Sequence, residues 1–206
     1  MHVDNRKLSA IFKLVIVALV IYAVVAGFTG SSGPSPLRYF TFQSNIVVGA
    51  VAFYLALGRL RAFPERFRLD SYLRGLTIFA ISITGIVFHV LLASELDHIS
   101  FTNQVLHTVV PVAFVLDWLV FGPKGSYRYR DILIWMIFPV VYLVATLIVA
   151  RFDGFYPYPF MDAGTFGYGT VALNVGLLVV AFTFLGGIYV NVDRLMSLSK
   201  RRASAA

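Results

Sequence analysis

Six long apolar stretches separated by short polar connections dominate the chain. They lie near residues 8–29, 39–58, 73–94, 101–121, 131–150 and 167–191. Each is long enough to cross a hydrocarbon core roughly 30 Å thick, which takes about 20 helical residues. Apolar residues surround each stretch on all sides, as in helices within lipid and unlike strands. The pattern predicts an all-α protein: one transmembrane domain of six helices over residues 1–206.

The first stretch has two interpretations. Arg6, Lys7 and Lys13 precede an apolar run from Leu14 to Thr29, as basic residues precede the core of a signal peptide. The run is near the upper limit for such a core, and the basic residues extend the helix backwards. We therefore interpret it as an uncleaved anchor.

Composition supports membrane insertion and narrows the chemistry. Hydrophobic residues make up 59% of the chain and charged residues 13%, which excludes an ordinary soluble domain. Since the chain has no cysteine, disulfides, thiolate metal sites and cysteine nucleophiles are excluded. The net charge of +7 lies in the connections, where anionic lipid headgroups are the expected partner rather than nucleic acid.

Lysine and arginine are concentrated on alternate connections. The two terminal regions and residues 59–74 and 122–130 hold 15 of the 17 basic residues, whereas only Arg38 and Arg151 lie on the other side. The positive-inside rule therefore predicts that both termini are cytoplasmic. We expect a multi-pass protein of a bacterial inner membrane.

Thr41 is the first polar candidate within the spans. A threonine near a helix start can cap the helix by accepting a hydrogen bond from a backbone N–H. Alternatively, its hydroxyl is a nucleophile at the positive end of the helix, where an oxyanion would be stabilised. Position alone leaves both interpretations open.

His107 is the second candidate, because it lies in another span that runs in the same direction and at a similar depth. Asn103, four residues earlier on the same helical face, could orient its ring. Pro111 has no N–H for the carbonyl of residue i−4, so we expect an irregular helix here, with the His107 carbonyl freed. A histidine near a threonine hydroxyl is the minimum apparatus for covalent acyl transfer, although it could also simply join two helices.

Other polar residues suggest alternatives. His89 lies about as deep as His107, so a two-histidine haem or metal site is conceivable, but two histidines are a weak signal. The acidic connection 95–98 is a similarly weak metal candidate, and we expect no metal and no cofactor. Asp117 lies about 15 Å deeper than His107, which makes it a poor third catalytic residue. We expect it to pair with an arginine of the cytoplasmic side, beside Trp118 as an interfacial anchor.

Three further residues are candidates for substrate contacts on the outer side. Arg38 and Arg151 could hold an acidic lipid head, or could merely reach toward phosphate. Tyr156 lies in the connection Phe155–Phe160, where aromatic residues alternate with prolines. That connection is either an interfacial aromatic belt or a rigid lid over a lipid cavity.

Three motifs together resemble a known family. The stretch RYFTFQSN at 38–45, the HTVVP element at 107–111 with its downstream Asp-Trp pair, and the YPYPF connection at 156–160 are similar to the androgen-induced-protein family of six-helix membrane proteins. The flanking sequences resemble its bacterial branch. Animal members are threonine hydrolases of fatty acid esters of hydroxy fatty acids. The resemblance implies that Thr41 is the nucleophile and His107 the essential histidine.

These observations predict a lipid-ester hydrolase with Thr41 as nucleophile and His107 as general base near the outer leaflet. Asn45 and Asn103 would support the site, with Arg38, Arg151 and Tyr156 at the substrate. The alternative is a lipid-binding or transport protein without catalysis, in which Thr41, Asn45, Asn103 and His107 line a cavity. Neither the native lipid nor any protein partner follows from the sequence.

Overall fold

The computed structural model describes residues 5–30, 33–60, 67–95 and 98–203, and every regular element among them is helical. Six helical stretches are long and apolar enough to cross a membrane: Asn5–Gly30, Phe40–Arg59, Leu69–Leu92, Phe101–Phe121, Asp131–Asp153 and Ala163–Ser199. Each overlaps one of the predicted spans, and the last extends beyond its predicted bounds by four residues at the start and eight at the end. The all-α prediction is thereby confirmed, and the protein is an integral, multi-pass membrane protein.

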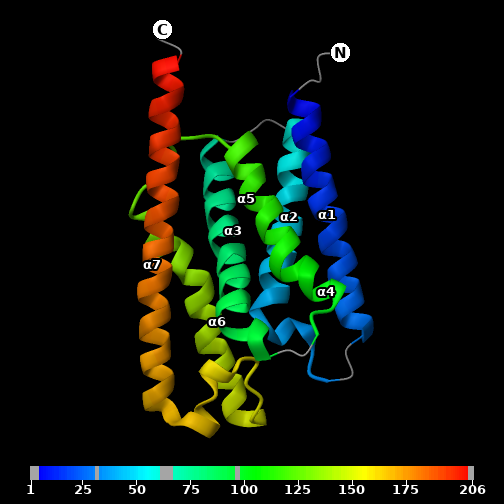
Figure 1. Cartoon of the computed structure of the whole chain (residues 1–206), viewed down its shortest axis with the longest axis vertical. Coiled ribbons are helices and arrows are strands. Elements are labelled where there is room, and N and C mark those ends of the chain that lie inside the picture. Colours follow the sequence, from blue (N-terminus) through cyan, green and yellow to red (C-terminus); the bar gives the residue numbers. More distant parts are fainter. Residues whose placement is uncertain (1–4, 31–32, 61–66, 96–97, 204–206) are drawn as a thin grey trace. The chain divides into compact units, whose positions relative to one another are not determined.

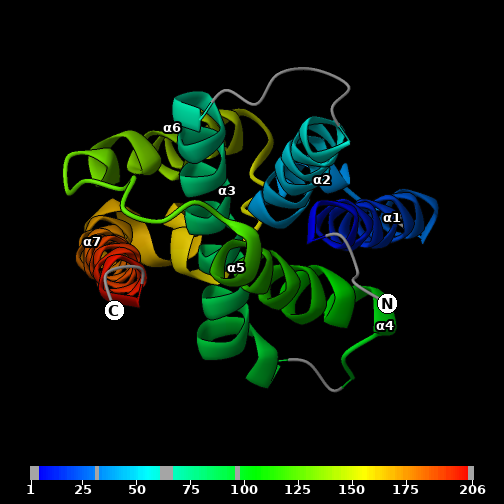
Figure 2. The same ribbon diagram turned by 90° about the horizontal axis from the view of Figure 1, so that it is seen from above.

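The chain divides into two compact units, Met1–Ser126 and Tyr127–Ala206. The first contains four of the spans. It also contains the polar residues that the sequence analysis singled out within the spans: Thr41, Asn45, His89, Asn103, His107 and Asp117. Its long helices are α1 (Asn5–Gly30), α2 (Phe40–Arg59), α3 (Phe67–Val87) and α5 (Val110–Phe121). Helix α1 contacts α2, α2 contacts α3, α3 contacts α5, and α5 returns to α1. Figures 1 and 2 show this ring of four helices from the side and from one end.

Small residues let the helices of the first unit approach closely. Ala23, Ala52 and Ala56 are fully buried on α1 and α2. On α3, a Cβ added at Gly85 would lie 3.1 Å from the His107 backbone carbonyl. Close backbone approach at small residues is the usual basis of helix packing in membranes, where the hydrophobic effect gives little drive. The lack of a side chain at Gly85 therefore allows α3 to lie close to the backbone of His107.

The third and fourth spans each contain one π-helical turn near the same end of the unit. Helix α3 continues into η2 (Phe88–Leu92) and the short η3 (Ala93–Glu95). The fourth span begins with α4 (Phe101–Gln104), passes through η4 (Val105–Val109) and continues as α5. The predicted irregularity near Pro111 is thus present. π-turns are rare in proteins, and those that occur often lie at functional sites. These two carry His89 and His107.

The second unit contains the last two spans. Helix α6 (Asp131–Asp153) ends at Gly154, whose φ of 70° gives the left-handed turn that terminates many helices. The aromatic connection then contains η5 (Pro159–Met161). Helix α7 (Ala163–Ala203) is interrupted at Gly167, where φ is 76°. The backbone N–H of Tyr127 donates to the side-chain oxygen Oδ2 of Asp193 (3.0 Å), which ties the segment before α6 to α7.

Candidate active site

Thr41 is the second residue of α2, and it is not the helix cap. The short turn η1 (Pro36–Arg38) leads into α2, and Tyr39, in an extended conformation, occupies the cap position without a side-chain cap. The capping interpretation of Thr41 is therefore wrong. The helix begins two residues earlier than that interpretation requires, which turns the Thr41 side chain into the bundle, where it is 6% exposed.

The Thr41 hydroxyl faces His107 in the interior of the first unit. Oγ1 of Thr41 lies 3.1 Å from Nε2 of His107, whose side chain is 8% exposed. The other ring nitrogen, Nδ1, lies 2.9 Å from the backbone carbonyl of Asn103. A carbonyl can only accept, so Nδ1 carries the hydrogen and Nε2 of the neutral ring is an acceptor. The threonine hydroxyl is consequently the donor to Nε2.

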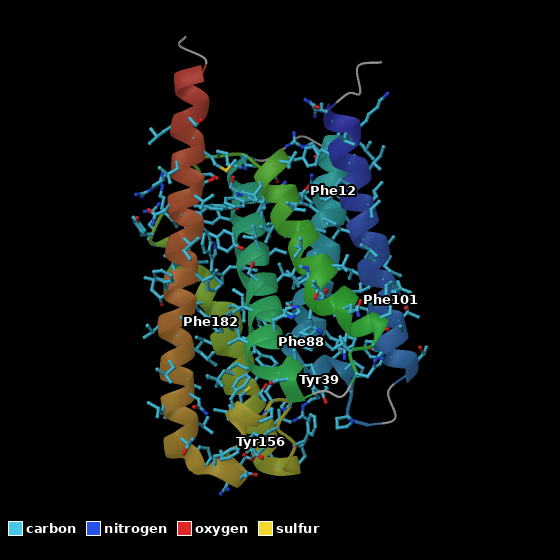
Figure 3. All side chains as sticks on the ribbon, viewed as in Figure 1. Phe12, Tyr39, Phe88, Phe101, Tyr156 and Phe182 are labelled. Carbon is cyan, nitrogen blue, oxygen red and sulfur yellow. The ribbon has the colours of Figure 1, made fainter. Side chains whose placement is uncertain are left out.

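Asn103 contacts the His107 ring through its backbone carbonyl, a group that any residue at this position would supply. It lies one turn before His107, as the spacing requires, but the group that reaches the ring is its carbonyl and not its side-chain amide. A fixed acceptor at Nδ1 selects the tautomer and the orientation of the imidazole, which is the role of the third group in hydrolytic triads. Phe88 of η2 stacks on the imidazole face, with its ring centroid 3.9 Å from that of His107. Figure 3 labels Phe88.

Asn45 joins the two segments that carry the pair. Its side chain is fully buried, and its amide nitrogen donates to the carbonyl of Thr41 (2.8 Å) and to that of Leu106 (3.2 Å). One side chain thus connects α2, beside the hydroxyl, to η4, beside the imidazole. The sequence predicted a supporting role for Asn45 without indicating these two acceptors.

The π-turn before Pro111 brings a second carbonyl, that of Leu106, into question beside the His107 carbonyl that the sequence predicted to be freed. In the π-turn the Val110 N–H bonds to the Val105 carbonyl, five residues back. Continuing that register would pair residue 111 with Leu106, and proline has no N–H to give. The side-chain donor of Asn45 accordingly goes to the Leu106 carbonyl. The α-helical spacing assumed from the sequence pointed to His107 instead.

The remaining predicted substrate contacts belong to different parts of the chain. Arg38 is half-buried at the end of η1 in the first unit, three residues before Thr41. Arg151 is exposed near the end of α6, and Tyr156 is half-buried in the following connection, both in the second unit. Partial burial, followed by Tyr168 and Asp162 beside it, raises the pKa of Tyr156 above its ordinary value.

The two histidines do not fit a haem held between them. Nε2 of His107 is engaged by Thr41, and Nε2 of His89 lies 2.9 Å from the Thr108 hydroxyl. The Phe88 ring contacts both imidazoles. Among the described residues, no group of three or more histidine, aspartate or glutamate side chains could hold a metal ion. Residues 96 and 97 of the acidic connection lie outside the described residues.

At the opposite end of the first unit, Asp117 pairs with Arg74, as expected, and also with Lys13. Both salt bridges are buried, and the Lys13 ammonium lies 2.6 Å from Asp117 Oδ1 and 2.6 Å from the Ser9 hydroxyl. The sequence placed Lys13 among the flanking charges of the first span, and gave no signal of this contact. Trp118 is 1% exposed, so its predicted role as an interfacial anchor is wrong. It packs inside the bundle.

The second unit contains an apolar groove. A groove of about 740 Å³ between α6 and α7 is lined mainly by apolar side chains, including Ile132, Val180, Phe184 and Ile188. It contains none of the residues that the sequence singled out. Apolar grooves on transmembrane helices are filled by lipid chains or other helices, and this one offers little polar chemistry.

These features define a polytopic α-helical membrane protein with a buried threonine–histidine pair. The model of the FAR-17a/AIG1-like protein family matches residues 76–192, more than half of the chain. The protein belongs to that family, which is the androgen-induced-protein family that its motifs resemble. The match includes His107 but begins after Thr41. Neither a curated protein nor a solved structure matches the chain.

Proposed function

We propose that this protein is a membrane-embedded hydrolase of lipid esters in which Thr41 is the nucleophile and His107 the general base. The observation that carries the proposal is the hydrogen bond between the Thr41 hydroxyl and Nε2 of an imidazole whose Nδ1 is held by the Asn103 carbonyl. A nucleophile, a base and a group that orients the base are the parts that acyl transfer requires.

The reaction would proceed in two steps. Thr41 Oγ1 attacks the ester carbonyl carbon while Nε2 of His107 takes its proton, and the resulting oxyanion lies near the positive end of α2. When the tetrahedral intermediate collapses, the C–O bond to the alcohol breaks and Nε2 returns the proton to the leaving alkoxide. Water, deprotonated by the same Nε2, then attacks the acyl-threonine, which releases the carboxylic acid and restores the Thr41 hydroxyl.

Burial of the pair supports a lipid substrate. Thr41, His107 and Phe88 are each less than a tenth exposed, and the spans that carry them are apolar enough to lie in hydrocarbon. A hydrogen-bonded pair in a low-dielectric interior is effective at stabilising developing charge, because water does not screen it. Under the predicted orientation, with cytoplasmic termini, the pair would lie in the outer half of the membrane.

A covalent probe tests the proposal directly. A fluorophosphonate should label purified wild-type protein at Thr41, and Thr41→Ala should take up none. The matched control is Thr84→Ala, since Thr84 is also a buried threonine of the first unit but bonds to Ser44 rather than to a histidine. If wild type takes up no probe and cleaves neither hydroxy-fatty-acid esters nor simple acyl esters, the protein is a lipid binder and not a hydrolase.

A further inference from the structure

A second threonine–histidine pair lies beside the first, and it is exposed. Nε2 of His89 is 2.9 Å from Oγ1 of Thr108. Thr108 directly follows His107, and His89 directly follows Phe88. His89 is exposed and Thr108 half-buried, whereas Thr41 and His107 are buried. The two π-turns therefore bring one pair to the interior and the other to the surface.

The surface around this second pair is apolar. Exposed side chains on the same two segments are Ile86, Val90, Leu91, Val109 and Val112. Both segments belong to spans that are apolar enough to cross a membrane. Polar side chains that face hydrocarbon are costly, and they default to functional roles. An exposed histidine that bonds to a threonine of the neighbouring span is therefore a candidate for a functional role as well as a link between the two spans.

The hydrogen bond within the pair leaves one polar hydrogen for a ligand. If Thr108 donates to Nε2 of His89, the ring carries its own hydrogen on Nδ1. If Nε2 donates to Thr108, the hydroxyl hydrogen is left over. Nδ1 of His89 has no hydrogen-bond partner in the part of the chain that the structure describes. In either arrangement the pair can donate one hydrogen bond to an oxygen that approaches from the lipid.

Phe88 is the side chain between the two pairs. Its ring stacks on His107 with centroids 3.9 Å apart and meets His89 edge to face at 5.2 Å. It is 3% exposed, so it closes the buried pair from the surface on this side. A group bound at His89 and Thr108 would be one aromatic ring away from the His107 imidazole.

We propose that His89 and Thr108 form a lipid-facing subsite that binds an uncharged oxygen of an acyl lipid, an ester carbonyl or hydroxyl, directly from the bilayer. The apolar side chains around the pair favour an uncharged group over a carboxylate or phosphate. The inference rests on the proposed hydrolase function for the fate of the lipid, but binding at the subsite does not require catalysis.

Photocrosslinking in vesicles tests the subsite. The full chain is reconstituted in phosphatidylcholine vesicles that contain a long-chain ester with a diazirine close to the ester group. Crosslinks should map to residues 86–92 and 105–112. Thr108→Val and His89→Leu should each lower their yield about fivefold, the effect of losing one net hydrogen bond. The double variant should be no worse than either single one, because both changes break the same pair.

Two controls keep the result specific. Val120→Ala removes an exposed apolar side chain farther along α5, outside both crosslinked ranges, and should leave the yield unchanged. A diazirine hydrocarbon of the same length without the ester should crosslink several-fold less to wild type at these positions, and this comparison needs no variant to fold. Equal crosslinking by ester and hydrocarbon, or yields unchanged in both single variants, would overturn the proposal.

Fluorophosphonate labelling of the same samples separates this inference from the proposed function. Ester-dependent crosslinking without labelling of Thr41 would uphold the subsite and refute the hydrolase. Labelling of Thr41 without ester-dependent crosslinking would refute the subsite and leave the hydrolase intact.

Discussion

Thr41 and His107 are separated by 66 positions in the sequence, and their side chains lie 3.1 Å apart in the interior of the first unit. The contact depends on two local features. Helix α2 begins at Phe40, which turns Thr41 inward, and a π-turn over Val105–Val109 carries His107. Asn45 connects the two segments by donating to a backbone carbonyl of each.

Substitutions of the pair should be strongly non-additive. Thr41→Ala and His107→Ala should each lower ester hydrolysis by about 10²–10⁴-fold, the range that a general base supplies. The double variant should be hardly worse than either, because a nucleophile and its base act as a unit. Thr41→Ser retains the hydroxyl and should retain measurable turnover. Steady-state kinetics on an acyl ester measure all four, and additive losses would contradict the unit.

Asn45 should prove to be a positioning residue. Asn45→Ala leaves the carbonyls of Thr41 and Leu106 without their side-chain donor, which should cost about 2 kcal/mol of stability for two hydrogen bonds. Asn45→Asp has nearly the same shape but cannot donate when ionised, so it should be at least as damaging. Asn45→Gln moves the amide by one methylene. In that variant kcat should fall more than KM rises, and a fall in stability alone would indicate a purely structural role.

Pro111→Ala should make the fourth span more regular. The restored N–H can bond to a carbonyl of the preceding turn, so thermal unfolding should occur at a higher temperature. The π-turn that carries His107 would then be free to revert to α-helix, which rotates the imidazole away from Thr41, and ester hydrolysis should fall. Measuring Tm and turnover together checks both. Unchanged or faster turnover would mean that the irregularity is only architectural.

The buried charge cluster should be essential for stability. In Asp117→Asn the cations of Lys13 and Arg74 lose their shared carboxylate, and breaking a buried ion pair costs about 3–5 kcal/mol. Adding Lys13→Met to Asp117→Asn removes one uncompensated charge and should recover part of the loss. Unfolding in mild detergent measures both, with Asp153→Asn, an exposed aspartate of the second unit, as the control. A loss in Asp117→Asn no larger than in that control would contradict the prediction.

Labelling tests the predicted orientation, and the chain has no native cysteine to interfere. Ser35→Cys, in the exposed segment before η1, should react with an impermeant thiol reagent in intact cells. Arg128→Cys, exposed before α6, should react only after the membrane is permeabilised. The reverse pattern would place both termini outside.

Hydropathy and residue counting are sufficient to predict the six helices and to single out Thr41 and His107 as a candidate pair. Lipid leaves the backbone no partner except itself, so twenty apolar residues in a row specify a helix whatever its neighbours are. Thr41 and His107 could be paired in advance because both lie at similar depths in spans of the same direction, and depth follows from counting residues along a helix.

Which atoms contact one another depends on the packing of the helices. Where α2 begins, and therefore whether Thr41 caps it, depends on how the η1 turn packs. The hydrogen bond from the Asn45 amide to the Leu106 carbonyl depends on the π-turn over Val105–Val109. A π-turn contains one more residue than an α-helical turn, and an apolar sequence does not indicate where that residue is added. From the sequence, Lys13 is one of the charges that flank the first span, whereas in the packed bundle it bonds to Asp117. Periodicity and hydropathy describe each helix alone, whereas hydrogen-bond partners are fixed by the rotation of helices against one another.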